Sequence, residues 1–304
     1  MDPVRYPISG LCRLFGVTKQ AYYKARTDVF ALPHEKEIEI AVFCHAEREL
    51  DPGIGCRKLW SIFIRESWPV SRRVFEDVVR AYGMMLKIKV RRMRTTNSLH
   101  GLPVYPNLVY STVPHRPCQI WVSDITYMSL RNADGSTRFC FISIVMDAYS
   151  RYVLGYYVGR TLETVYSTIA LTMALETSVR LRLDISGLIH HSDRGVQYAS
   201  LEYVKVLKEN HIQISMTENG NPKDNPQAER INSTVKNELI KNMEFTSIEQ
   251  VQRALDEKIP YYNNRRPHMS LGGLTPMEAL SRQGRLKKSW HSYRDDAIGT
   301  AKGV

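Results

Sequence analysis

The feature that most constrains the fold of this chain is a succession of short strands and helices that begins at Ile120. Alternating apolar and polar residues predict three consecutive antiparallel strands, Trp121–Met128, Phe139–Met146 and Tyr152–Val158, joined by turns at 134–135 and 147–150. The pattern continues with a helix over Thr164–Val179, an apolar strand Gly187–His191, a helix over Leu201–Asn210 and a strand Ile212–Met216. Strand–helix–strand crossovers bring later strands parallel to the first, so we expect an α/β domain with a mixed sheet and flanking helices.

The surplus of positive charge lies mainly in the first third of the chain. Lys and Arg outnumber Asp and Glu by 42 to 31, and residues 1–118 hold 19 basic against 11 acidic side chains, which is +8 of the net +11. A basic surface favours a polyanionic partner because each phosphate that it neutralises releases condensed counterions. DNA and RNA are the commonest such partners, and charge alone does not choose between them.

The composition argues against several other classes of protein. The odd number of cysteines and the absence of a Cys-x-x-Cys pair argue against a complete disulfide framework. No apolar run reaches the roughly 18 to 20 residues of a membrane span, and the N-terminus lacks the apolar stretch of a secretory signal. We therefore expect a cytosolic protein with no membrane partner.

Helix-turn-helix units are predicted in the basic front region. The first has helices over residues 8–15 and 18–23, and the second has a helix around Leu59–Phe63, a turn at Trp68-Pro69 and a helix capped by Ser71. Arg72 and Arg73 would begin that last helix, where recognition helices meet the base edges of DNA. An ordinary helical hairpin is the alternative.

Four parts are predicted along the chain. They are a helical DNA-binding region at 1–95, a linker at 96–118, the α/β domain with its C-terminal helices at 119–282 and a basic tail at 283–304. The basic run at 87–94 leads into the linker, which lacks sustained periodicity. This run is either a solvated charge cluster or a segment that follows a phosphate backbone.

Three acidic residues occupy places that favour a shared site. Asp124 lies in the middle of the first strand, where an unpaired carboxylate is costly to bury, and Asp193 follows the apolar strand ending at His191. Glu229 lies in the early turns of a helix for which Asn225 is the expected N-cap and Pro226 the first residue. We expect the three carboxylates to meet at one edge of the sheet.

The helix of Glu229 is predicted to be amphipathic. Ala228, Ile231, Val235 and Leu239 form its apolar stripe, whereas Glu229, Asn232 or Ser233, and Lys236 fall on the other side. Lys236 follows Glu229 by nearly two turns, roughly 10 Å along the axis of an α-helix, so its amine could hold a phosphate on the same face.

Three carboxylates suit Mg²⁺ or Mn²⁺, which prefer oxygen ligands and keep positions for water and phosphate oxygens. Two such ions can activate an attacking water or 3′-hydroxyl and stabilise the leaving oxygen, so the protein need not supply a nucleophile. This chemistry is consistent with a sequence that offers no Ser-His-Asp or Cys-His candidate.

The spacing and the local sequences resemble the DDE integrase core within the ribonuclease H-like fold. Asp193 and Glu229 have 35 residues between them, and Lys236 follows at the offset typical of that family. The resemblance runs over about residues 119 to 280 through five segments: Trp-Val-Ser-Asp-Ile-Thr-Tyr, Met-Asp-Ala-Tyr-Ser-Arg, His-Ser-Asp-Arg-Gly-Val-Gln-Tyr, Asp-Asn-Pro-Gln-Ala-Glu and Tyr-Asn-Asn-Arg-Arg-Pro-His. The chain is most similar to insertion-sequence transposases made by frameshifting, and specifically to the product of the downstream frame.

This resemblance implies a role for each matched residue. Asp124, Asp193 and Glu229 would be the catalytic residues and the ligands of the Mg²⁺ or Mn²⁺ ions, with Lys236 contacting DNA near the bond to be cut. No structural zinc is implied, because the front lacks the paired His and Cys module of retroviral integrases. Arg265 and Arg266 would touch DNA or pair with helix carboxylates. For Asp147, Asn225, His190 and His191 we favour structural roles.

The activity implied is DNA transposition: metal-dependent strand cleavage and transfer of a 3′-hydroxyl to a new phosphodiester at the ends of an insertion sequence. The partners implied are double-stranded DNA of the terminal repeats and target, further copies of this chain, and a possible upstream-frame product, all in the bacterial cytoplasm at the nucleoid. The alternatives are a nuclease of the same fold that does not join ends, and a catalytically silent DNA-binding regulator or inhibitor.

Overall fold

The computed structural model describes residues 7–20, 32–86, 102–218 and 225–290. Its centre is a five-stranded sheet in the order β3-β2-β1-β4-β5. β1 pairs antiparallel with β2, and β2 with β3, whereas β4 lies parallel to both β1 and β5. The strands are β1 Ile120–Arg131, β2 Thr137–Asp147, β3 Val153–Gly159, β4 Ile189–Ser192 and β5 Gln213–Met216. The predicted mixed sheet and ribonuclease H-like order are confirmed.

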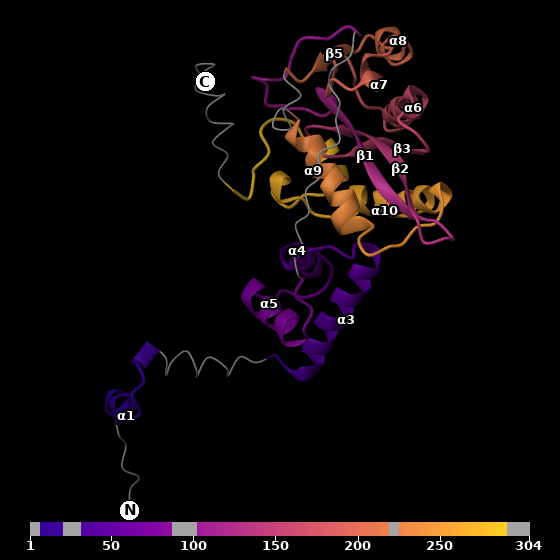
Figure 1. Cartoon of the computed structure of the whole chain (residues 1–304). Helices are drawn as coiled ribbons and strands as arrows, with labels where there is room; N and C mark the ends of the chain where they lie inside the picture. Colours follow the sequence, from indigo (N-terminus) through magenta and orange to yellow (C-terminus); the bar gives the residue numbers. More distant parts are fainter. Residues whose placement is uncertain (1–6, 21–31, 87–101, 219–224, 291–304) are drawn as a thin grey trace, which may run out of the picture.

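Helices cover both faces of the sheet (Figure 1). One face is covered by α6 Thr164–Arg180, α7 Val196–Ala199 and α8 Leu201–Glu209. The other face is covered by α9 Pro226–Thr234, the π-helical turn η3 Val235–Leu239 and α10 Ile248–Asn264. A 3₁₀ turn, η4 Met269–Leu271, and α11 Pro276–Leu280 follow α10. No helix in the described ranges is long and apolar enough to cross a membrane.

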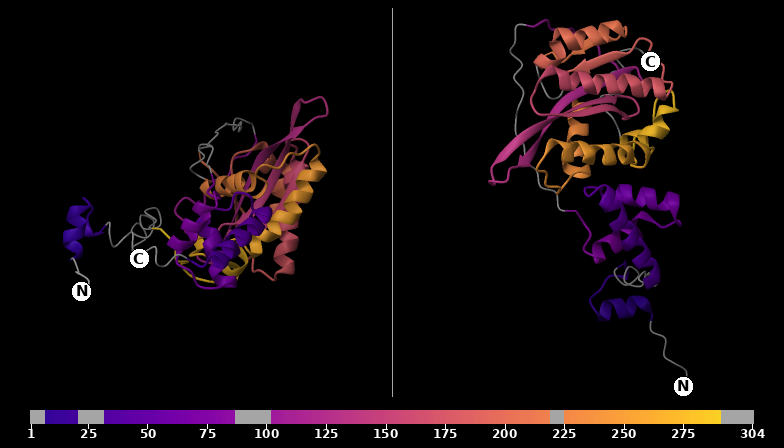
Figure 2. Two further views of the ribbon diagram at one scale, coloured as in Figure 1. Left: turned by 90° about the horizontal axis from the view of Figure 1, so that it is seen from below. Right: turned by 90° about the vertical axis from the view of Figure 1, so that its right-hand side faces the viewer.

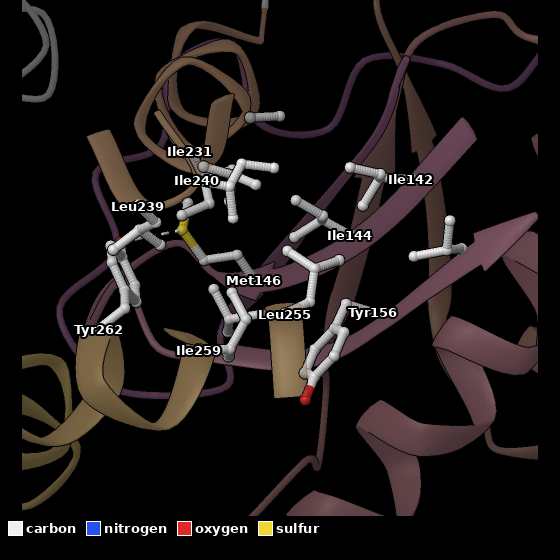
Figure 3. Packing of buried hydrophobic residues seen from close by; sticks show 14 of the residues in the cluster. Ile142, Ile144, Met146, Tyr156, Ile231, Leu239, Ile240, Leu255, Ile259 and Tyr262 are labelled. Carbon is white, nitrogen blue, oxygen red and sulfur yellow. Dashed lines mark hydrogen bonds between the residues drawn. The ribbon is translucent and has the colours of Figure 1, made fainter. Parts of the chain in front are cut away.

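The alternation of residues along the strands divides the core into two layers. On β2, Ile142, Ile144 and Met146 pack against α9, η3 and α10, as Figure 3 shows, whereas Val145 points into the opposite layer with Trp121. Successive side chains of a strand point to opposite faces, so a central sheet buried on both faces needs apolar residues at nearly every position. The face that carries α9 is therefore fixed by the even-numbered residues of β2.

The predicted turns are confirmed. Gly135 closes the β1–β2 hairpin with a φ of 81°, a conformation that glycine adopts without steric cost. At the β2–β3 turn the Asp147 carboxylate is fully buried and accepts hydrogen bonds from the Cys118 amide at 2.8 Å and the Ser150 amide at 2.7 Å. Asp147 therefore has the structural role that the sequence favoured.

A separate helical unit precedes the sheet. It consists of α3 His34–Leu50, α4 Cys56–Glu66 and α5 Arg72–Ala81, packed around Phe63 and Phe75. The Ser71 hydroxyl caps α5 by accepting from the Val74 amide at 3.3 Å, so the two predicted helices and the predicted cap are confirmed, whereas their assignment as a helix-turn-helix stays a prediction. α3 was not predicted. Figures 1 and 2 show this unit against the α10 side of the core.

The first helix-turn-helix is described only in part. Its first helix is α1 Ile8–Leu14, and Gly16 follows with a φ of 64°. Of the second helix, expected over residues 18–23, only residues 18–20 are among those described, and the basic run at 87–94 and most of the basic tail lie outside the described residues. The boundaries at residues 95, 118 and 282 stay predictions.

Candidate catalytic site

Asp124 and Asp193 occupy equivalent positions on two neighbouring parallel strands. The last paired residues of β1 and β4 are Val122 and His191, and each aspartate comes two residues later in its chain. Because β4 ends at Ser192, β1 has no strand on that side at Asp124. The parallel register therefore brings the two carboxylates to the same opening beside the sheet.

The electrostatics of Asp124 support this placement. Burial raises the pKa of Asp124 to about 7, and the charge of Asp193 raises the pKa further than that of Glu229 does. Two hydrogen bonds act in the opposite direction: the Ile125 amide donates to Oδ1 at 2.9 Å and the Asn232 amide group donates to Oδ2 at 2.8 Å. Asp124 is thus held in one orientation while it faces a second carboxylate.

A tight turn fixes the other aspartate. The Gly195 amide donates to Asp193 Oδ1 at 2.9 Å. A Cβ at Gly195 would lie 2.9 Å from that oxygen and 3.0 Å from Gln197 Oε1, so only glycine fits without a shift. The sequence Ser-Asp-Arg-Gly after β4 therefore aims the Asp193 carboxylate by its backbone geometry.

Glu229 lies at the rim of this site. It is exposed in the first turn of α9, and burial alone raises the pKa of its carboxyl. Among the described residues, no three His, Cys, Asp or Glu side chains are grouped closely enough to hold a metal ion. The structure therefore brings Asp124 and Asp193 together and leaves Glu229 on the neighbouring helix, within electrostatic reach of Asp124.

The predicted apolar stripe of α9 is confirmed, and one detail of its start is wrong. Ala228, Ile231, Val235 and Leu239 are all buried. Asn225 is the N-cap residue, but its side chain makes no capping bond. Its amide instead donates to the Ser123 carbonyl at 3.2 Å, which ties the start of α9 to β1 beside Asp124.

Lys236 lies in η3, where the α-helical hydrogen-bond pattern has changed to a π-helical one. The prediction that Glu229 and Lys236 share one face of a continuous α-helix is therefore wrong in its geometry. Lys236 Nζ lies 3.9 Å from the ring centroid of Tyr127 on β1, and burial lowers the pKa of the amine. A cation held over an aromatic face remains a charged donor at the rim of the site.

Arg72 and Arg73 begin α5 as predicted, and both are exposed. Their nearest acidic partners lie one turn along the helix: Glu76 is 3.2 Å from Arg72 and Asp77 is 3.9 Å from Arg73. Surface pairs of this kind are worth little, so both guanidinium groups can exchange a carboxylate for a phosphate.

Of the two roles predicted for Arg265 and Arg266, the structure shows pairing with carboxylates. Arg265 makes a hydrogen bond of 2.6 Å to Glu47 and another of 2.6 Å to Glu66. Arg266 is 1% exposed and contacts Asp51 at 3.0 Å and also Glu238. A DNA contact by Arg266 is contradicted by this burial, since a phosphate could reach it only by displacing two carboxylates.

The residues behind β1 form a buried polar cluster. His190 Nε2 lies 2.8 Å from Ser123 Oγ and 2.9 Å from the Tyr203 hydroxyl, so its structural role is confirmed. Tyr198 was not predicted: its hydroxyl is buried and has no hydrogen-bond partner among the described residues. The Tyr198 ring approaches Gly195 beside Asp193, and no pattern in the sequence indicates this approach.

The chain matches family models described as an integrase core domain over residues 114–222 and 210–276. It is 32% identical to the transposase of insertion sequence IS629 from Shigella sonnei, covering 74% of this chain and 73% of that protein. It is 30% identical to a 31 kDa protein of insertion element IS600 from the same species, covering 88% of this chain and 96% of that protein. The transposase of insertion sequence IS3A from Escherichia coli K12 is 28% identical, with 89% and 93% covered.

The likeness to solved structures is more distant. The catalytic core domain of HTLV-2 integrase in complex with magnesium superposes with a TM-score of 0.40 and 17% identity, covering 54% of this chain and 97% of that one. The fold assignment accordingly rests on the observed sheet order and on the matched family models.

Proposed function

Since the chain belongs to the insertion-sequence transposases with an integrase core domain and is an enzyme of DNA transposition and strand transfer, we propose that its chemistry takes place at Asp124, Asp193 and Glu229. The observation that carries the proposal is the equivalent placement of Asp124 and Asp193 on two parallel strands, two residues beyond Val122 and His191. Two carboxylates placed beside each other at the end of a strand pair repel when both are ionised, and a bound cation would offset that repulsion.

The donor set fits divalent cations. Asp124 and Asp193 offer carboxylate oxygens at one opening, Glu229 lies at its rim, and the pKa of Asp124 is raised to about 7 by burial and by the charge of Asp193. Such a pair is stabilised by a cation, and hard cations such as Mg²⁺ and Mn²⁺ select oxygen ligands. We propose that the three carboxylates would hold two such ions, which would supply a lowered pKa for an attacking water or 3′-hydroxyl and positive charge for the leaving oxygen.

The other residues of the site orient groups. Asn232 and the Ile125 amide hold the Asp124 carboxylate, and Gly195 holds that of Asp193. Lys236 remains a positive donor beside Tyr127 and can hold a DNA phosphate near the bond that is cut. Glu229 would have to turn toward the two aspartates to join them, and its exposed position in the first turn of α9 leaves the side chain free space for such a rotation.

The DNA partner is double-stranded, and we propose that it consists of the element's terminal repeats and the target. Arg72 and Arg73, exposed at the start of α5, would contact the repeat, and Arg265 at the end of α10 would keep its pairing with Glu47 and Glu66 of the helical unit. Oligomerisation on DNA, cooperation with an upstream-frame product and a place in the cytoplasm at the nucleoid follow from the family as proposals.

A strand-joining assay tests this proposal. The full chain is incubated with Mg²⁺, a duplex that carries the terminal repeat with a labelled 3′-hydroxyl end, and an unlabelled target plasmid. We expect the label to become covalently attached to the target, as judged on denaturing gels. Release of labelled fragments with no attachment would instead indicate a nuclease of the same fold, and binding with neither reaction would indicate a silent regulator.

A further inference from the structure

The π-helical turn η3 connects two parts of the molecule. Lys236, in its second position, reaches Tyr127 on β1 beside the catalytic site. Glu238, two residues later, faces away from the site and contacts Lys58 of α4 and Arg266. One short turn is therefore in contact both with β1, three residues beyond Asp124, and with the helical unit.

The backbone of the α3–α4 turn rests directly on η3. The Gly53 amide donates to the Glu238 carbonyl at 2.9 Å. A Cβ at Gly53 would lie 2.7 Å from the Asn237 carbonyl oxygen and closer still to the backbone of Glu238. Gly53 does not have a positive φ, so its lack of a side chain serves this close approach and no special turn geometry.

Buried charges close the same contact. The guanidinium of Arg266 lies between Asp51, at 3.0 Å, and Glu238, and Lys58 Nζ lies 2.9 Å from the Glu238 carboxylate. Asp51 is 0% exposed and Arg266 1% exposed. Such a network is costly to open because it would leave buried charges without partners, which favours one fixed docking position.

A second set of bonds extends the contact along α10. Lys258 Nζ donates to the Glu49 carbonyl at 2.8 Å, and the Tyr261 hydroxyl donates to Glu47 at 3.0 Å. Arg265 adds its bonds to Glu47. The segment Tyr-Asn-Asn-Arg-Arg-Pro-His at residues 262–268, which the sequence singled out, thus holds the helical unit through Arg265 and Arg266.

We propose that docking of the α3–α4 turn on η3 positions Lys236 and the α9 helix for strand joining, so that the helical unit is part of the active-site scaffold as well as a DNA-binding module. The proposal rests on the function proposed above. Gly53 and Arg266 are positioning residues: neither touches DNA or the reacting atoms, and they act through η3.

The chain offers a matched pair of glycines for the test. Gly53→Ala places a methyl group against the backbone of η3, whereas Gly55→Ala, at the start of α4, meets no atom within 4 Å. Hydrogen–deuterium exchange is measured on each full-length protein. The exchange rates of the backbone amides around Gly53 and in η3 report whether the two segments are docked. The rate of a single turnover of joining is measured on terminal-repeat DNA that is already bound. This rate reports the positioning of Lys236 and α9 and does not depend on the affinity for DNA.

We expect Gly53→Ala to speed exchange at residues 235–239, to leave exchange in the interior of α4 and α5 unchanged, and to slow joining per bound complex at least about 10-fold. Its affinity for the terminal repeat should stay within about 2-fold of that of Gly55→Ala. Normal exchange in Gly53→Ala would overturn the docking claim. Lost protection at η3 with an unchanged joining rate would overturn the positioning claim.

A second variant covers the case in which Gly53→Ala fails to fold. Glu238→Gln keeps the size of the side chain and removes the charge that faces Lys58 and Arg266, and Glu209→Gln, an exposed partner of Lys205 on α8, is its control. The same two readouts should change for Glu238→Gln only. Joining by the Gly55→Ala protein tests the proposed function itself, so a failure there is distinguishable from a failure of the docking claim.

Discussion

In the proposed site, the backbone holds two carboxylates close enough to each other to raise the pKa of Asp124. Asp124 and Asp193 lie at equivalent positions because Val122 of β1 pairs with His191 of β4 and each aspartate comes two residues later. Burial and mutual repulsion raise the pKa of Asp124 to about 7 from the ordinary 3.8. An ionised carboxylate in this position destabilises the metal-free fold, and the stability that its protonated form provides is lost as the pH rises through about 7.

Asp124→Asn should therefore stabilise the metal-free protein while it removes the site. At pH 8 we expect the Tm to rise by roughly 2 to 4 °C, the shift that about 1 kcal/mol produces in a domain of this size. Asn232 Oδ1 is buried without a hydrogen-bond partner among the described residues, so rotation of the Asn232 amide lets it accept from the introduced amide. The measurement is thermal unfolding in chelator.

The control for this prediction is Asp77→Asn on the exposed face of α5, where the carboxylate pairs with Arg80 at 2.8 Å in solvent. Its Tm should change by less than about 1 °C, because surface pairs contribute little. A fall in the Tm of Asp124→Asn below that of wild type would contradict the picture of two repelling carboxylates.

Single residues were also where prediction from the sequence succeeded and failed most visibly. The strand position of Asp124 and the turn that carries Asp193 follow from apolar periodicity and turn chemistry, which are local signals. The burial of Arg266 does not, because its partner Asp51 lies 215 residues away in the sequence. Tyr198 ends the matched segment that begins at His191, but no local pattern indicates that its hydroxyl is buried without a hydrogen-bond partner among the described residues.

At the scale of elements, the strands were predicted more accurately than the helix that carries Glu229. β1–β5 and the two hairpin turns follow the alternation of apolar and polar residues, and β1 extends three residues beyond its predicted end to Arg131. α9 was expected to continue to Leu239, but it changes to a π-helix at Val235. No glycine or proline marks this change, and its visible partners, Tyr127 and the α3–α4 turn, lie elsewhere in the chain.

The change in helix type has a consequence for the site. π-helical turns are rare and occur often at functional sites, since they alter the direction of the side chains that follow. Here Lys236 is directed to Tyr127, and Glu238 to Lys58 and Arg266. An uninterrupted α-helix would present these two side chains in other directions, and the proposed link between docking and strand joining depends on this turn.

At the scale of the whole molecule, the docking network fixes where the helical unit lies relative to the site, but the surplus charge lies outside this unit, because residues 34–81 hold 8 basic and 9 acidic side chains. The charge bias was legible from the sequence, because residues 1–118 carry +8 of the net +11. The docking itself was not, because it is made by residues from α3, α4, η3 and the end of α10. Deleting residues 1–95 would remove Asp51 and expose the buried Arg266, which would add a new positive charge to the surface. Point variants therefore test DNA contact without this second change.

Replacing Arg72 and Arg73 together with alanine should weaken binding to the terminal repeat and reduce its salt dependence. Each phosphate contact contributes about 0.9 to the slope of log K against log salt, so the loss of two contacts lowers the slope by about 1.8. Fluorescence anisotropy over a salt series measures this slope. Arg80→Ala, at the other end of α5 and 63% exposed, is the control and should leave the slope unchanged. An unaltered slope in the double variant would show that α5 does not contact phosphates.

The most direct test of the central claim, that Asp124, Asp193 and Glu229 carry the chemistry, is Mg²⁺-dependent joining by single-carboxylate variants of the full chain. We predict that Asp124→Asn, Asp193→Asn and Glu229→Gln each reduce covalent joining of a labelled 3′-hydroxyl end below detection while the affinity for the terminal repeat survives. Glu209→Gln, an exposed residue of α8 paired with Lys205, should join at the wild-type rate. Near wild-type joining by any one of the three variants would contradict the account and remove that residue from the site.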